Sequence, residues 1–157
     1  TGVIYTARDA AHKRMLENLH KGIALPVDLK DQTIYFAGPA PAKPNEPIGS
    51  VGPTTSYRMD AYSPETIELG LTCMIGKGAR SKEVVDAMKK YGAVYIGAVG
   101  GAGALISQCV KKCEVVDYAD LGSEAIHRLE VVDFPGIVII DSEGNNLYET
   151  EPPKYKK

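Results

Sequence analysis

Hydrophobic positions recur with two different spacings along this chain. Ala11, Met15 and Leu19 lie at every fourth position, which predicts an amphipathic helix over residues 7–21 with Thr6 as its N-cap. Elsewhere, β-branched and aromatic residues gather in short apolar runs, which predict strands at residues 2–5, 33–37, 93–99, 115–116, 129–132 and 136–140. Strands that alternate with helices in this way indicate an α/β fold.

Capping residues and glycines mark three more helices. Ser63 begins a short helix that Gly70 ends, and Ser81 begins a longer one that ends at Gly92. A glycine-rich turn after the strand at 93–99 predicts a helix that reaches about Cys113.

An extended loop is expected after the second predicted strand. Pro39, Pro41, Pro44 and Pro47 each lack a backbone N–H, so neither a helix nor a central strand can persist through this segment. The polar residues that follow the loop are therefore not explained by the packing of a helix or a strand.

Length and charge narrow the class of protein. The 157 residues, 44% of them hydrophobic, fit one globular domain over residues 1–157. The 18 basic and 20 acidic residues give a formal net charge of -2, which disfavours nucleic-acid binding. No apolar run approaches the roughly 20 residues that span a bilayer, and no signal peptide opens the chain. We therefore expect a soluble cytoplasmic protein that binds neither nucleic acid nor membrane.

Cysteine and histidine positions do not predict a metal site in this chain. Cys109 and Cys113 lie four apart on the predicted helix and are better explained as small buried hydrophobic residues than as ligands. With Cys73 they make 3 cysteines, fewer than an iron–sulfur cluster usually needs. The histidines are too scattered for a three-histidine zinc site.

Two glycine-rich segments raise the question of a nucleotide site. Residues 70–78 lack the spacing of a phosphate-binding loop, and residues 97–103 lack that of a dinucleotide-binding motif. The second segment, between a predicted strand and a predicted helix, leaves two interpretations. Its glycines allow close packing of the helix on the strand, which we favour, or its backbone N–H groups bind an anion.

The segment after the proline-rich loop carries candidate chemistry. Residues 54–56 supply three hydroxyls, and Arg58 supplies a guanidinium, whose planar fork of donors matches a carboxylate. A carboxylate-binding site is one interpretation. The other is a polar turn in which Arg58 pairs with Asp60 or Glu65.

Two further cations favour the binding site. Arg8 lies in the first turn of its predicted helix, where the helix dipole opposes a positive side chain that is better placed to bind an anion. Lys77 stands between Gly76 and Gly78, which allow the backbone to approach a ligand closely. With Arg58, these cations predict a site for a polyanionic small molecule if the fold brings them together.

Six segments resemble those of one enzyme family. They are TARDAAH at residues 6–12, GPTTSYRMD at 52–60, MIGKG at 74–78, GAVGGA at 97–102, EAI at 124–126 and EVVDFP at 130–135. In this combination and order, the chain resembles the β subunit, or C-terminal domain, of class I iron–sulfur fumarate hydratases and the related L-tartrate dehydratases. Members of the family carry residues before the first of these motifs, so the resemblance implies that an N-terminal segment is missing here.

The resemblance implies a fold, a cofactor and a partner. The fold would be a swivelling β/β/α domain of three layers, with a parallel central sheet and a smaller antiparallel sheet. A [4Fe–4S] cluster would be held by three cysteines of a partner α subunit and not by this chain. Two α and two β subunits would form the hetero-oligomer.

The resemblance also implies roles for individual residues. Arg8 and Arg58 would clamp the carboxylates of the substrate, and Lys77 and Thr55 would contribute to binding. Thr54 would lie at the reacting carbon as the candidate base. Tyr57 stands where many relatives carry a smaller residue.

The implied activity is that of a hydro-lyase that interconverts fumarate and (S)-malate. Dehydration of L-tartrate is the alternative within the same class, because it would use the same clamps on a dicarboxylate with one more hydroxyl. A non-catalytic module that binds a carboxylate or a nucleotide is the alternative from another class.

Overall fold

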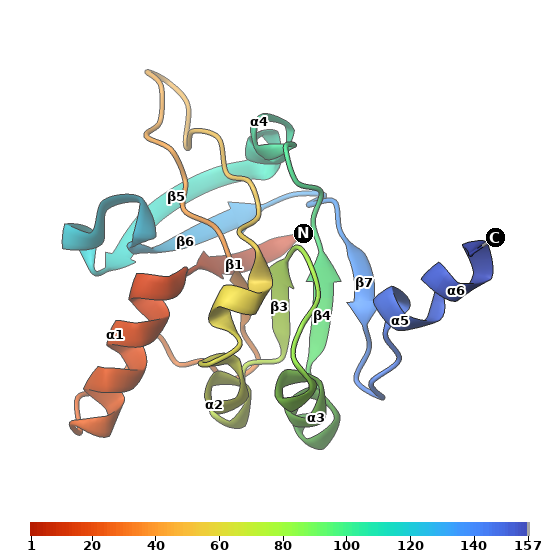
Figure 1. The fold of residues 1–157 in the computed structure, drawn as a ribbon. Helices are drawn as coiled ribbons and strands as arrows, with labels where there is room; N and C mark the ends of the chain where they lie inside the picture. The colour runs from red at the N-terminus through yellow and green to blue at the C-terminus, as the bar shows by residue number, and fades with distance from the viewer. Residues whose placement is uncertain (157) are drawn as a thin grey trace.

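The computed structural model describes residues 1–156, whose strands form one seven-stranded sheet. The strands are β1 (Gly2–Thr6), β2 (Thr33–Tyr35), β3 (Cys73–Gly76), β4 (Val94–Gly97), β5 (Val110–Asp117), β6 (Ile126–Val131) and β7 (Ile137–Ile140). Their order across the sheet is β5-β6-β1-β2-β3-β4-β7 (Figure 1). The fold is therefore α/β, as the alternating pattern predicts.

The sheet is parallel in its centre and antiparallel at both edges. Strands β1 to β4 pair in parallel, with Ile34 opposite both Tyr5 and Met74. Strand β6 pairs antiparallel with β1 from Gly2↔Val131 to Thr6↔His127. Strand β5 pairs antiparallel with the other side of β6. The expected smaller antiparallel sheet is thus not separate among the described residues, because β6 bonds directly to the central strands.

Helices and 3₁₀ turns connect the strands. The α-helices are α1 (Asp9–His20), α2 (Ser63–Glu68), α3 (Lys82–Tyr91), α4 (Gly103–Ile106), α5 (Leu147–Thr150) and α6 (Pro152–Tyr155), and the 3₁₀ segments are η1 (Ser56–Met59), η2 (Ser107–Cys109) and η3 (Ala119–Glu124). No helix formed by residues 1–156 is both long and apolar enough to cross a membrane.

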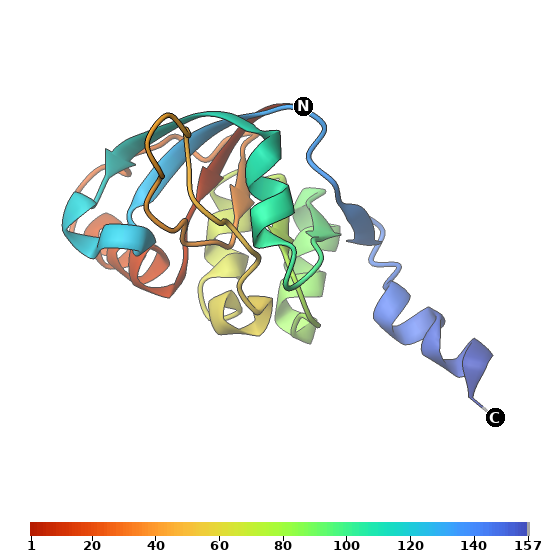
Figure 2. The same cartoon turned by 90° about the horizontal axis from the view of Figure 1, so that it is seen from above.

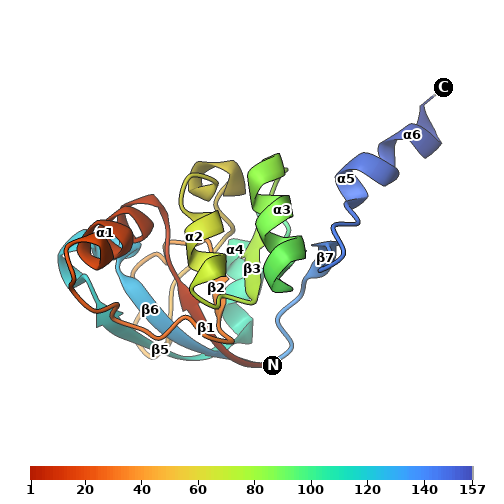
Figure 3. The ribbon, with the colours of Figure 1, turned by 90° about the horizontal axis from the view of Figure 1, so that it is seen from below.

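The sheet separates two hydrophobic cores. Helices α1, α2 and α3 cover one face, while α4 and the proline-rich loop cover the other (Figures 1 and 3). Side chains alternate between the faces along a strand, so Ile34 belongs to the core under the helices and Tyr35 to the core under the loop. The alternation recurs at Met74 and Ile75 on β3. Beyond β7, α5 and α6 project away from the sheet (Figure 2).

Several predicted elements are confirmed. Ser81 caps α3 by accepting a hydrogen bond from the Val84 amide, and Gly92 ends that helix in the left-handed conformation, with φ of 82°. The segment between β2 and η1 has neither helix nor strand, as its prolines require. Helix α2 begins at Ser63 with Tyr62 as its N-cap, one residue earlier than expected for the cap.

Two predictions at element ends are wrong. Thr6 does not cap α1, because it remains in β1 through its pairing with β6 and its hydroxyl bonds to the His127 ring, so Arg8 takes the cap position. The predicted helix to Cys113 ends at Ile106, with a 3₁₀ turn up to Cys109. From Val110 the chain is β5, whose backbone groups find partners along β6.

Candidate active site

The candidate site lies beyond the carboxyl ends of the parallel strands in the centre of the sheet. Arg8 follows β1, the proline-rich loop and Thr54 follow β2, and Lys77 follows β3. The glycine turn at 98–102 follows β4 at the same end. Because the carboxyl ends of parallel strands lie at the same end of a sheet, segments far apart in the sequence meet there.

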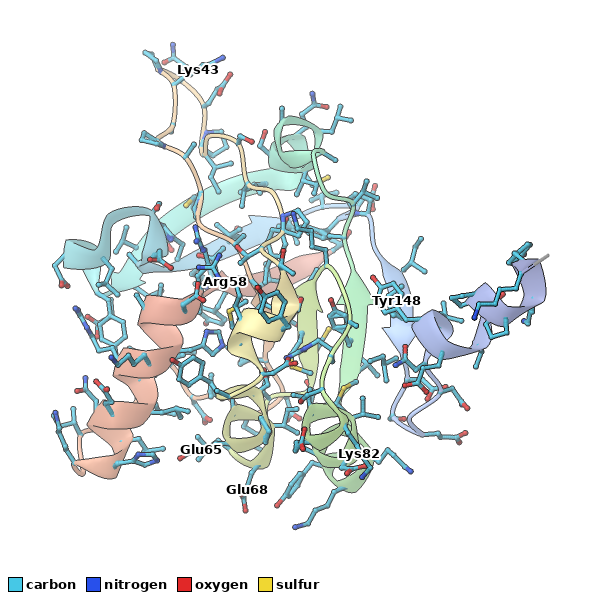
Figure 4. All side chains as sticks on the ribbon, viewed as in Figure 1. Lys43, Arg58, Glu65, Glu68, Lys82 and Tyr148 are labelled. Atoms are coloured by element: carbon cyan, nitrogen blue, oxygen red, sulfur yellow. The ribbon has the colours of Figure 1, made fainter. Side chains whose placement is uncertain are left out.

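Arg8 and Arg58 share one carboxylate. The Arg58 Nε donates to Asp9 Oδ1 at 2.9 Å, and Arg8 Nε lies 3.9 Å from Asp9 Oδ2. The predicted alternative, a pair between Arg58 and Asp60 or Glu65, is wrong, because Asp60 binds Arg80 and Glu65 binds His20. Figure 4 shows Arg58 near the middle of the molecule and Glu65 well below it, near its lower end.

The Arg8 side chain is confined on two further sides. A Cβ at Gly38 would lie 3.0 Å from Arg8 Cδ and 3.1 Å from Arg8 Nη1, so glycine leaves room for the guanidinium. Glu124 Oε1 lies 3.5 Å from Arg8 Nε. That buried Nε has no hydrogen bond within the described residues, so only the looser charge contacts hold it.

The hydroxyl segment is fixed by its backbone. The Thr54 amide donates to the Phe36 carbonyl at 2.6 Å, which ties the end of the loop to the end of β2. Thr55 forms an isolated parallel bridge with Lys77, and the Ser56 amide donates to the Lys77 carbonyl at 2.8 Å. Thr54, Thr55 and Lys77 therefore come from adjacent stretches of backbone, and Arg58 follows within one 3₁₀ turn.

Lys77 reaches along the glycine turn after β4. A Cβ at Gly100 would lie 3.5 Å from Lys77 Nζ, so the lysine passes close to that backbone. Helix α4 has only 4 residues, which is too short for an anion site at its N-terminus. A Cβ at Gly103 would meet Ser50 and Gly52, so glycine allows close packing here, but against the segment before Thr54 and not against the strand as predicted.

Arg80 is a structural residue of the site that the sequence did not predict. Its fully buried guanidinium donates to Asp60 Oδ1 at 2.7 Å and to Ser63 Oγ at 2.6 Å, and lies over the rings of Phe36 and Tyr95. Burial lowers the pKa of Arg80, and the neighbouring Asp60 opposes that shift. This pair fastens the end of η1 to the segment that follows Lys77.

His12 is fully buried on α1, four residues after Arg8. Its Nδ1–H donates to the Arg8 carbonyl at 2.8 Å, which leaves a buried Nε2 without a partner among the described residues. Its ring packs edge-on to Phe36 and stacks on Tyr62. Burial lowers the pKa of His12 to about 4, and the nearby Arg80 charge acts in the same direction.

The three cysteines lie on separate elements of the structure. Cys73 lies on β3, Cys109 in η2 and Cys113 on β5, so the last two do not share a helix as predicted. Burial raises the pKa of Cys73 and of Cys113, which disfavours the thiolate that binds metal. Within residues 1–156, no group of three or more His, Cys, Asp or Glu side chains is placed to hold a metal ion.

The arrangement is suited to a small molecule with more than one negative charge. Arg8, Arg58 and Lys77 lie at one end of the sheet, and the Thr54 and Thr55 hydroxyl groups belong to the stretch between them. Tyr57 is 65% exposed beside Arg58. The fold is that of an α/β domain, and a candidate site with three cations and two threonines lies at the ends of its parallel strands.

Comparison with known proteins identifies the family. The model of the family described as "Fumarase C-terminus" matches residues 1–151, and the chain belongs to this family. Fumarate hydratase 1, mitochondrial, from Leishmania major is 44% identical over 155 residues, which are 95% of this chain and 28% of that protein. Fumarate hydratase class I, aerobic, from Escherichia coli is 42% identical over 150 residues, or 94% of this chain and 27% of that protein.

A shorter relative matches over most of its length. A Methanocaldococcus jannaschii protein, provisionally named L(+)-tartrate dehydratase subunit beta, is 44% identical over 154 residues, which are 94% of this chain and 79% of that protein. The chain thus spans less than a third of the two fumarate hydratases but most of this subunit. The predicted resemblance to both groups is confirmed.

Proposed function

We propose that this chain is the β component of a hydro-lyase that interconverts fumarate and (S)-malate. The observation that carries the proposal is the shared Asp9 contact, which holds Arg8 and Arg58 together while Lys77 lies beside Thr55. Three cations grouped in this way suit a dicarboxylate. Family membership and the names of the relatives support the same reaction class.

The proposed site works by clamping the substrate and by moving one proton. Arg8 and Arg58 bind the two carboxylates, while Lys77 and Thr55 add charge and a hydrogen bond. Thr54, as the alkoxide, removes a proton from the carbon next to a carboxylate, and the electrons of that C–H bond form the double bond as the C–O bond on the adjacent carbon breaks. The departing hydroxyl takes a proton from an acid of the partner and leaves as water. The negative charge that develops on that carboxylate makes the cations most valuable in the transition state.

Thr54 needs help to act as a base, because a free aliphatic hydroxyl is a very weak acid. Positive charge nearby favours the alkoxide. Arg58 and Lys77 supply this charge from segments that flank the threonine. Tyr57, exposed beside Arg58, bears on which dicarboxylate the proposed clamp accepts.

The proposal includes a partner and a moving domain. We infer that the [4Fe–4S] cluster belongs to an α subunit, because the described cysteines of this chain lie on three separate elements. The matching relative from M. jannaschii is named as a subunit, whereas the matched segment in L. major is part of a longer chain. In this proposal residues 1–157 form one swivelling domain that closes its cationic end on the partner in an assembly of two α and two β subunits.

Reconstitution tests the reaction and ranks the alternatives. The chain is assembled anaerobically with its cluster-bearing partner, and hydration of fumarate is compared with dehydration of L-tartrate. We expect turnover of fumarate and none by the isolated chain. Turnover of tartrate alone would make this a tartrate dehydratase subunit. Tight binding of a dicarboxylate by the isolated chain, without turnover in the assembly, would establish the non-catalytic module instead.

A further inference from the structure

Two loops that carry the proposed site residues meet along a short junction. The first loop contains Thr54 and continues into η1 with Arg58, and the second contains Lys77. Their direct backbone contacts are the bridge between Thr55 and Lys77 and the hydrogen bond from the Ser56 amide to the Lys77 carbonyl. The relative position of the candidate base and the lysine depends on this junction.

A tyrosine hydroxyl connects the same two loops from beneath. Tyr95, on β4, donates its hydroxyl proton to the Gly78 carbonyl at 2.8 Å. Because that proton is used, the contact of 2.8 Å with Ser56 Oγ is a hydrogen bond donated by the serine. One phenol oxygen therefore links the residue after Thr55 to the residue after Lys77.

The junction is closely packed and excludes water. Ser56 and Tyr95 are both 0% exposed. A Cβ at Gly76 would lie 2.0 Å from Ser56 Oγ and 2.9 Å from the Phe36 ring, so only glycine allows the serine to occupy this position. The Arg80 guanidinium lies over the Tyr95 ring and is itself held by Asp60. This contact restrains the ring.

We propose that Tyr95 is a positioning residue, which fixes Thr54 and Arg58 relative to Lys77 through its bonds to Ser56 and Gly78. This inference rests on the proposed function. Tyr95 acts through the backbone of the two loops, and its hydroxyl is committed to protein partners. The rate of a chemical step falls steeply when the reacting groups shift by a fraction of an ångström from their productive positions. A loose junction therefore lowers kcat more than it raises KM.

The chemistry of the phenol suits a permanent link. Burial raises the pKa of Tyr95 to about 12, although the Ser56 hydrogen bond opposes the shift. The phenol therefore keeps its proton at neutral pH and remains a donor to Gly78 and an acceptor from Ser56. The two hydrogen bonds should not weaken between pH 6 and pH 9, because even pH 9 lies about three units below the pKa of Tyr95.

A pair of tyrosine variants tests the proposal in the assembled two-component enzyme. Tyr95→Phe removes only the linking hydroxyl. Tyr35→Phe is the matched control, because Tyr35 is equally buried on β2 and its hydroxyl also donates to a backbone carbonyl, that of Val51, at 2.7 Å. We expect Tyr95→Phe to lower kcat by about 10- to 100-fold with a smaller change in KM, and Tyr35→Phe to change kcat less than about threefold.

A second variant and a second measurement separate positioning from general loosening. Ser56→Ala cuts the same link from its other end, so the double variant Ser56→Ala/Tyr95→Phe should lose no more activity than the worse single variant. Hydrogen exchange of the assembled enzyme should quicken over residues 54–60 and 76–81 in Tyr95→Phe and stay unchanged there in Tyr35→Phe.

The outcomes distinguish this inference from the proposed function. If the wild-type assembly hydrates fumarate and Tyr95→Phe matches Tyr35→Phe in kcat and in exchange, the positioning role is wrong and the function stands. If the fold-loss of activity in the double variant equals the product of the two single losses, Ser56 and Tyr95 act independently and the proposed link is also wrong. If the wild-type assembly turns over no dicarboxylate, the function is wrong, and unchanged exchange over the two loops in Tyr95→Phe would then overturn the link as well.

Discussion

The parallel centre of the sheet and its antiparallel edges differ in the segments that extend from their strands. Segments after β1, β2 and β3 carry Arg8, Thr54 and Lys77, and they are joined by buried hydrogen bonds and ion pairs. At the β7 edge, Ile137 is 61% exposed and Val138 51% exposed, and no strand pairs with the outer side of β7 among residues 1–156. Topology therefore gathers the polar chemistry at one place.

The comparison also separates two kinds of arginine. Arg80, wholly buried, spends its donors on Asp60, Ser63 and a methionine sulfur. Arg58, whose side chain is 43% exposed, donates from its Nε to Asp9 Oδ1. The first arginine is fixed by protein partners, and the second is the one that we propose as a clamp for the substrate.

The largest effect is expected from the candidate base. Thr54→Ala should lower kcat by about 10²- to 10⁴-fold, the usual contribution of a general base, with little change in KM. The matched control is Thr72→Ala at the amino end of β3, where the hydroxyl donates to the Gln32 carbonyl. Steady-state kinetics of the assembled enzyme measure both, and an unchanged kcat for Thr54→Ala would remove it as the base.

Arg58 should follow in size. Arg58→Ala should cost about 2–4 kcal/mol of transition-state stabilisation, or roughly 30- to 1,000-fold in kcat/KM. Arg14→Ala is the control, because Arg14 also pairs with an aspartate, Asp120, at 2.7 Å but lies outside the site. A fall in kcat/KM of less than about tenfold for Arg58→Ala would contradict its role as a clamp.

The buried His12 should make stability depend on pH. Its pKa of about 4 in the folded chain lies below the ordinary 6.5, so the unfolded chain binds a proton first as the pH falls. The free energy of unfolding should therefore decrease by about 3 kcal/mol between pH 6.5 and pH 4, beyond the contribution of other groups.

Denaturant unfolding at several pH values measures this dependence. His12→Asn keeps a donor near the Arg8 carbonyl but cannot titrate. The difference in unfolding free energy between wild type and variant should thus narrow as the pH falls. A constant difference from pH 7 to pH 4 would show that His12 is not held neutral by burial.

The smallest effect is expected at the antiparallel edge. Ile137→Ser on β7 should change the free energy of unfolding by less than about 1 kcal/mol, because the side chain is mostly exposed. Turnover by the assembled enzyme should be unchanged. A loss of turnover as large as that of Arg58→Ala would show that the two regions are not functionally separate.

Local signals predicted β1, β2, β4 and α3, because the residues that specify them are adjacent in sequence, but they did not predict the central strand β3. Ser81 and Gly92, for example, act on the helix between them. Strand β5 was predicted only at residues 115–116, because its charged residues, Lys111, Lys112 and Glu114, hide an apolar pattern and its pairing with β6 is a tertiary contact. Glycines before α4 gave a helix signal that the strand pairing cut short.

For the site, sequence could name the cations but not their supports. Arg8, Arg58 and Lys77 stood out because no helix or strand explains them, and family resemblance grouped them. Arg80 gave no signal, since a lysine or arginine before a helix usually faces water. Tyr95 was indistinguishable from other residues of a buried strand, because its partners Ser56 and Gly78 lie far away in the sequence.

The carboxylates beside Arg8 have a consequence for electroneutrality. Asp9 and Glu124 offset two of the three cations, so the site by itself carries an excess of about one positive charge. A dianion that enters would reverse the sign of this balance. In the proposed assembly we therefore expect the partner to supply a compensating cation, since a partner surface without one would leave a bound dicarboxylate under-neutralised.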